Sequence, residues 1–202
     1  MAEGIGSMVG GMASALGGIV GGHQKETIIL RISYLFLSVD NKISDADLTL
    51  FDEVGKSIDK FSEMREKIID DCENLLSKAS ESSNRFSIIN KEISSCITYI
   101  RSESNGNRDI LWALINLFFR TQNRSKKHTQ LIKTWAEENQ IDASIVLEMF
   151  DIYETQIKII EYREWLETSN NLSPKEIITI SQQLDVNQKS IEQSISDLIA
   201  LG

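Results

Sequence analysis

"LRISYLFLSVDNKISDADLTLFDEV", residues 30–54, contains two helical patterns separated by a turn. Around Leu35 the first pattern is apolar on almost every side, which is typical of a helix buried in a core. Asp40 suits the turn, and Ser44 followed three positions later by Asp47 has the pattern of a helix N-cap. This stretch therefore predicts a helical hairpin.

Helical spacing continues through the rest of the chain, and no segment shows sustained alternation with period two. Ser173 and Pro174, the only proline, are typical of the start of a further helix. We predict an all-α globular bundle of seven to eight helices with a glycine-rich N-terminal segment. The predicted domains are a glycine-zipper-like segment, a helical bundle domain and a C-terminal helical hairpin: 1–22, 23–168 and 169–202.

Composition limits the classes of function. The 202 residues carry a formal net charge of -9, which argues against a protein that mainly coats nucleic acid. Cys72 and Cys96 form no CxxC pair, so we expect buried thiols in a reducing compartment. No GxSxG or phosphate-loop motif accompanies the two histidines, His23 and His128, and we expect no enzymatic activity.

Asp40, Ile43, Ser44 and Asp47, with Asp45 beside them, resemble the first helical hairpin of the tellurite-resistance TerB-like family. The similarity would extend over residues 25–167. It implies a compact helical domain with an internal pseudo-repeat, whose second copy would fall at residues 111–150. It also implies a role in bacterial stress response or defence.

Metal binding is one implication of this resemblance, because family members with two acidic clusters are candidate metal binders. The second copy here has Gln122 or Asn123 near the acidic turn position and His128 near the later one, so a two-cluster site is not expected. The first acidic cluster consists of Asp40, Asp45 and Asp47. These residues have two interpretations, helix capping or a weak Ca²⁺ or Mg²⁺ site. No other cofactor is expected.

A basic run lies between residues 120 and 133, where the acidic chain has no Asp or Glu. It could contact lipid headgroups, nucleic-acid phosphates or an acidic protein, or it could be a solvated helix face. The candidate contacts are Arg120, Arg124, Lys126, Lys127 and Lys133.

The C-terminal region has the outline of a helix-turn-helix, with a turn at residues 185–187. Its second helix offers Lys189 alone as a cation, against Glu192 and Asp197. A hairpin that closes the bundle is therefore favoured over a DNA-binding element, and nucleic acid is not an expected partner.

Residues 4–22 are uncharged, and small residues recur in this region every four positions, at Gly6, Gly10, Ser14, Gly18 and Gly22. On a helix they would form a groove that another backbone can approach closely. Eight glycines would destabilise a free helix in water, so the pattern favours packing against other copies or in a bilayer. A disordered tail and a helix docked on the domain's own surface remain alternatives.

These features predict a non-enzymatic interaction protein that associates with membrane lipid or assembles as a homo-oligomer through residues 4–22. The alternatives are a membrane-permeabilising pore former and a helix-turn-helix regulator. The expected location is cytoplasmic, peripheral to the inner membrane or conditionally inserted in it.

Overall fold

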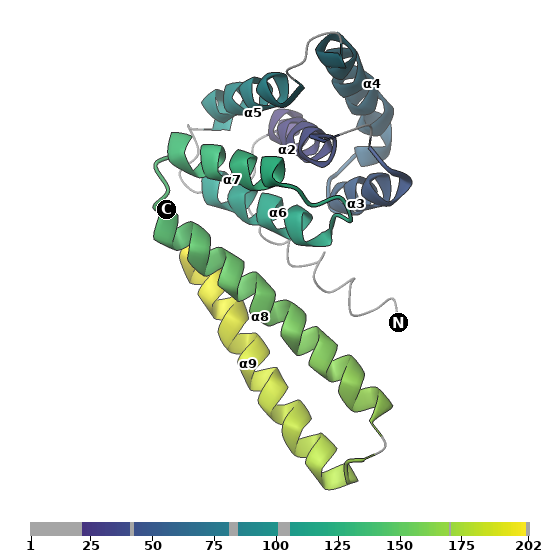
Figure 1. The fold of residues 1–202 in the computed structure, drawn as a ribbon, viewed down its shortest axis with the longest axis vertical. Coiled ribbons are helices and arrows are strands. Elements are labelled where there is room, and N and C mark those ends of the chain that lie inside the picture. Colours follow the sequence, from purple (N-terminus) through teal and green to yellow (C-terminus); the bar gives the residue numbers. More distant parts are fainter. Residues whose placement is uncertain (1–21, 41–42, 81–84, 101–105, 170, 201–202) are drawn as a thin grey trace. The chain divides into compact units, whose positions relative to one another are not determined.

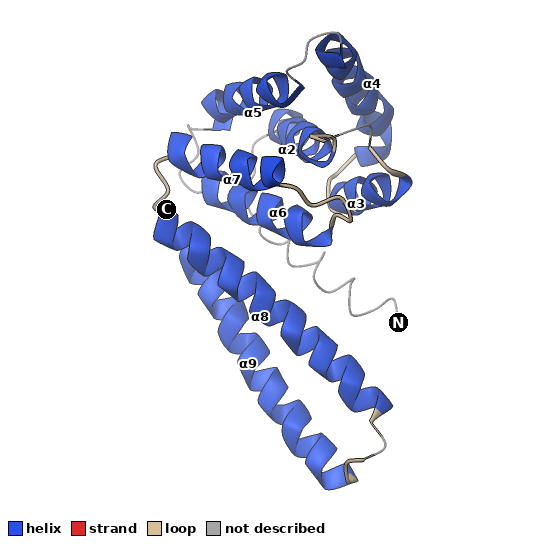
Figure 2. Ribbon diagram, in the orientation of Figure 1, coloured by secondary structure: helices blue, strands red, loops and turns tan. Residues whose placement is uncertain are grey.

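The computed structural model describes residues 22–40, 43–80, 85–100, 106–169 and 171–200. All regular elements in these ranges are α-helices, eight in number, and none is a strand (Figure 2). The predicted all-α class is thereby confirmed. The helices are α2 (Gly22–Leu37), α3 (Asp45–Gly55), α4 (Phe61–Ser80), α5 (Arg85–Ile100), α6 (Gly106–Arg120), α7 (Lys126–Glu138), α8 (Ala143–Thr168) and α9 (Pro174–Ala200).

The contacts divide the chain into two compact units, one up to Ala143 and the other from Ser144 onward. In the first unit, α2 is the central helix and packs against α3, α4, α5 and α6 (Figure 1). Its side chains Leu30, Leu35 and Phe36 are fully buried. The nearly continuous apolar pattern of this helix follows from its being enclosed by neighbours on several sides.

Two of the predicted N-caps are present. The hydroxyl of Ser44 accepts from the backbone N–H of Asp47 at the start of α3. As α9 begins at Pro174, the hydroxyl of Ser173 accepts from the backbone N–H of Glu176 over 3.4 Å, and Glu176 Oε2 accepts in return from the Ser173 N–H over 2.8 Å. These bonds satisfy backbone donors that the first turn of each helix would otherwise leave open.

The end of α3 requires glycine. A Cβ atom on Gly55 would lie 2.3 Å from ring carbons of Phe61, whose ring packs edge-on against Phe51. We expect Gly55→Ala to lower the free energy of unfolding by about 1–3 kcal/mol, because the added methyl forces these rings apart. Urea denaturation measures this loss, and adding Phe61→Leu should recover part of it. If the double variant loses as much stability as the two single variants added together, the close approach of Gly55 to the Phe61 ring is contradicted.

The second unit is an antiparallel pair formed by α8 and α9. Ile159 and Leu166 of α8 and Leu184 of α9 are its buried core. Arg163 joins the helices by donating to Asp185 Oδ1 over 2.7 Å and to Gln188 Oε1 over 3.1 Å. The predicted domain boundary after residue 168 falls in the loop between these two helices, inside the second unit.

The predicted turn at residues 185–187 is wrong, because α9 continues through it from Pro174 to Ala200. Leu184 and Ile191 pack on opposite sides of the expected break, so tertiary contacts hold the helix together there. Side-chain bonds at a spacing of four, such as Gln183 Nε2 to Asn187 Oδ1, add local support. The continuous helix excludes both a helix-turn-helix at this place and the hairpin predicted within residues 169–202, whose single helix pairs instead with α8.

Candidate functional site

Polar side chains from two places in the first unit meet: the α2–α3 segment with the first turn of α3, and the α6–α7 segment with the first turn of α7. Thr121 Oγ1 donates to Asp47 Oδ1 over 2.7 Å, and Asn123 Nδ2 donates to Asp47 Oδ2 over 3.1 Å. We refer to this cluster as the loop junction. Its members are Asp40, Ser44, Asp47, Thr121, Asn123, Ser125, Lys127 and His128.

Asp47 is the centre of the loop junction, and its side chain is only 1% exposed. Besides Thr121 and Asn123, the hydroxyl of Ser44 lies 2.7 Å from Asp47 Oδ2 and donates to it. Asp47 also lies in the first turn of α3, where the helix dipole favours negative charge. The carboxylate is buried because these neighbouring donors replace its water.

His128 lies beside Asp47 in the loop junction and is also 1% exposed. Its Nδ1 accepts from the backbone N–H of Ser125, in a capping box that begins α7. Nδ1 is also 3.6 Å from Asp40 Oδ2, and the Phe36 ring packs edge-on against the imidazole at 4.8 Å. Burial lowers the pKa of His128, and this effect outweighs the opposing one from Asp40.

Acid should therefore destabilise the protein through His128. The unfolded state takes up a proton near pH 6.5, whereas the folded state resists protonation until the pH is lower. Stability is then full above about pH 6.5 and falls as the pH drops below it. His128→Gln keeps an acceptor for the N-cap without titrating. His23 is present in both proteins and cannot cause a difference between them. If the variant loses less stability at acid pH than the unmodified protein, His128 is the source of the difference. Equal dependence of stability on pH in the two proteins would contradict this role.

The predicted metal cluster does not converge on one point. Asp45 is exposed at the start of α3, Asp47 is engaged by uncharged donors, and Asp40 lies 3.2 Å from Lys127 Nζ. Across the described ranges, no three His, Cys, Asp or Glu side chains are grouped so that they could hold a metal ion. Hydrogen-bond donors engage both oxygens of Asp47 and an ammonium lies beside Asp40, so these residues as placed do not form a Ca²⁺ or Mg²⁺ site.

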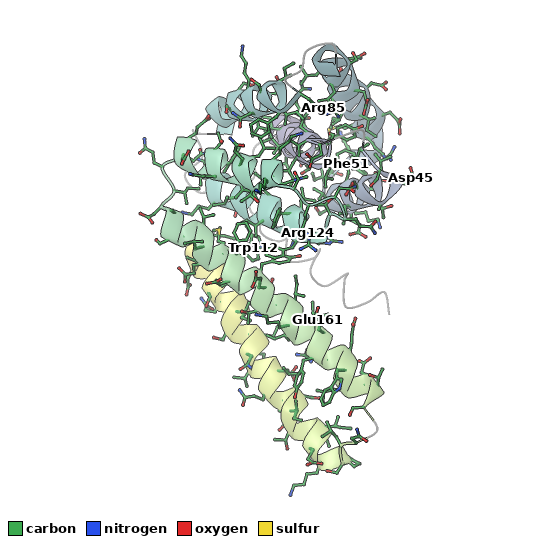
Figure 3. All side chains as sticks on the ribbon, in the orientation of Figure 1. Asp45, Phe51, Arg85, Trp112, Arg124 and Glu161 are labelled. Carbon is green, nitrogen blue, oxygen red and sulfur yellow. The ribbon has the colours of Figure 1, made fainter. Side chains whose placement is uncertain are left out.

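The basic run is partly neutralised within the chain. Arg120 pairs with Glu53, Lys127 with Asp40, and Lys133 with Glu137 on the next turn of α7. Arg124, which Figure 3 labels, and Lys126 are both exposed. Neither has an ion-pair partner among the residues that the structure describes. The charge available to an anionic partner is therefore smaller than the five residues suggest.

Both cysteines are buried and unpaired, as predicted. Burial raises the pKa of Cys72 to about 12 and the pKa of Cys96 to about 11, so neither is a thiolate near neutral pH. We expect Ellman's reagent to leave both thiols unmodified in the folded protein and to titrate both in denaturant. Rapid reaction of one thiol under native conditions would contradict this burial.

The glycine-rich segment lies largely outside the described residues. This applies to Gly6, Gly10, Ser14 and Gly18, while Gly22 is the first residue of α2. None of the described helices combines the length with the apolar, nearly uncharged composition that a bilayer crossing requires.

No protein-family model, curated protein or solved structure matches the chain. The TerB-like resemblance thus remains an expectation from the residues quoted above. Asp47 and His128 stand out in the sequence, whereas Thr121 does not, because its contact with Asp47 spans 74 positions. The only local signal is that Thr121 and Asn123 are polar residues that directly follow the apolar end of α6.

Proposed function

We propose that this chain is a non-enzymatic interaction protein that attaches to membranes or to other copies of itself through residues 4–22. The observation that carries this proposal is the four-residue period of small residues. That period ends at Gly22, which is also the first residue of the central helix α2. A contact made by the segment would therefore be connected directly to the core of the first unit.

The loop junction supports a structural role for the polar residues of this unit. Asp47 and His128 are each 1% exposed. Asp47 in the first turn of α3 accepts from Thr121 after α6, and His128 in α7 lies 3.6 Å from Asp40 after α2. The TerB-like resemblance supports a setting in bacterial stress or defence.

Liposome flotation tests the membrane part of the proposal. The full chain is compared with a chain that begins at Gly22, using neutral and anionic vesicles, and both are sized without lipid. We expect that only the full chain floats with the vesicles, or that it forms larger assemblies than the shortened chain. Identical behaviour in both measurements would overturn the proposal.

A matched pair of variants tests the groove itself. Gly10→Leu with Gly18→Leu fills the four-residue stripe, whereas Gly11→Leu with Gly17→Leu adds the same apolar groups elsewhere. Assembly through the groove should be lost only in the first variant, because large side chains there block close backbone approach. Dye release from vesicles by the unmodified chain, absent in the first variant only, would instead favour the pore-forming alternative.

A further inference from the structure

The second unit exposes large apolar side chains. Among the described residues, the exposed large hydrophobic side chains all lie in α8 or α9: Leu147, Tyr162, Trp165, Ile178 and Val186. Trp165 is 46% exposed and stacks on Tyr162, with ring centroids 5.1 Å apart and planes 14° from parallel. Stacking restricts the indole, so less side-chain entropy remains to be lost when it is covered.

These α8 residues belong to a longer regular row. Starting at Leu147 and ending at Trp165, six exposed residues follow one another at spacings of four, three, four, three and four. We call this row the α8 stripe. It consists of Leu147, Asp151, Glu154, Lys158, Glu161 and Trp165.

The α8 stripe lies on a different face from the contacts with α9. The helical repeat places it well away from Ile159 and Leu166, which form the core of the second unit. Figure 3 shows Glu161 on the side of α8 that is turned away from α9. The spacing of the stripe is that of a coiled-coil seam, in which every residue can meet a residue of a facing helix.

The α8 stripe can pair with the α8 stripe of a second copy that runs in the opposite direction. If two copies of α8 run antiparallel about a two-fold axis near residue 156, Leu147 faces Trp165 of the second copy at each end. In the middle, Glu154 faces Lys158 of the second copy, and the symmetry makes this ion pair twice. The remaining layer places Asp151 opposite Glu161, which is unfavourable but screened by solvent at an exposed position.

We propose that the α8 stripe is a two-fold contact surface between two copies of this chain. Apolar pairs at both ends supply the attraction, and the central opposite charges fix the antiparallel register. The contact uses no residue of the glycine-rich segment and does not depend on the function proposed above. With four charged residues among six, it is a weak and reversible contact.

Charge exchange on the full chain tests the register. Glu154→Lys makes both central positions positive, and Lys158→Glu makes both negative, so each variant repels its own copies at two symmetric places. We expect each to weaken self-association by about tenfold in sedimentation equilibrium, in line with two like-charge contacts in an exposed interface. Circular dichroism confirms that the helices persist.

Mixing the two variants is the decisive experiment. A mixed dimer restores opposite charges at both central places, although each single chain keeps its like-charge pair within α8. Energy transfer between differently labelled variants should therefore show mixed dimers that form as readily as those of the unmodified protein. If both variants associate as the unmodified chain does, or if the mixture is no tighter than either variant alone, the proposal is overturned.

The apolar ends are tested separately. Trp165→Ala should weaken association by about a hundredfold or more, since it removes a large aromatic anchor at both ends. Val186→Ala is the matched control, because Val186 is 61% exposed on α9 and outside the stripe, and it should change nothing. Equal effects of the two variants would count against the α8 stripe.

Discussion

Replacing Asp47 by Ala should lower the free energy of unfolding by about 3–5 kcal/mol, among the largest effects expected for a single polar side chain in this protein. The substitution removes the acceptor to which both Thr121 and Asn123 donate in the loop junction. Thr121 is itself 1% exposed, so water cannot replace the lost bond without rearrangement. Urea denaturation followed by circular dichroism measures the change.

Asp45→Ala is the control for that experiment. Asp45 lies in the same first turn of α3 and shares the favourable position near the helix dipole, but it is exposed. We expect it to lose no more than about 1 kcal/mol. If Asp45→Ala and Asp47→Ala destabilise equally, the loop junction contributes nothing beyond the charge at the helix end.

Phe36→Ala should also lower the free energy of unfolding by about 3–5 kcal/mol, because it leaves a cavity beside the central helix. Phe36 is fully buried on α2, and its ring packs against the imidazole of His128. Water entering the cavity would reduce the desolvation that lowers the pKa of His128, so that pKa should rise toward its usual value. Calorimetry measures the first effect and the NMR titration of the imidazole measures the second.

Phe36→Leu serves as the comparison because it keeps most of the apolar volume. It should lose less stability than Phe36→Ala and leave the pKa of His128 closer to that of the unmodified protein. An unchanged or lower His128 pKa in Phe36→Ala would contradict burial by this ring as a cause of the shift.

Local signals in the sequence predicted the helical class and two helix starts. Ser44 with Asp47, and Ser173 with Glu176, cap helices as their spacing indicates, because an N-cap involves residues only three positions apart. The apolar pattern around Leu35 likewise identified a buried helix, since burial on several sides requires apolar residues on several sides.

Features that depend on distant contacts were predicted less well. Asp185 and Asn187 are typical turn residues, yet α9 passes through them because Leu184 and Ile191 pack along the hairpin. The loop junction brings Asp47 to Thr121 and Asn123, and no local pattern indicates such a pairing. Acidic residues near a turn therefore suggested metal ligands, although hydrogen bonds across the fold use the oxygens of Asp47.

The early position of α2 in the chain affects folding during synthesis. Its partner α6 begins at Gly106, and the bond between Thr121 and Asp47 closes only after 74 further residues have been made. At a translation rate of about 5–20 residues per second, that interval lasts roughly 4–15 s. During this time the buried central helix of the first unit emerges from the ribosome without its later neighbours, so its apolar side chains stay uncovered until α6 has been made.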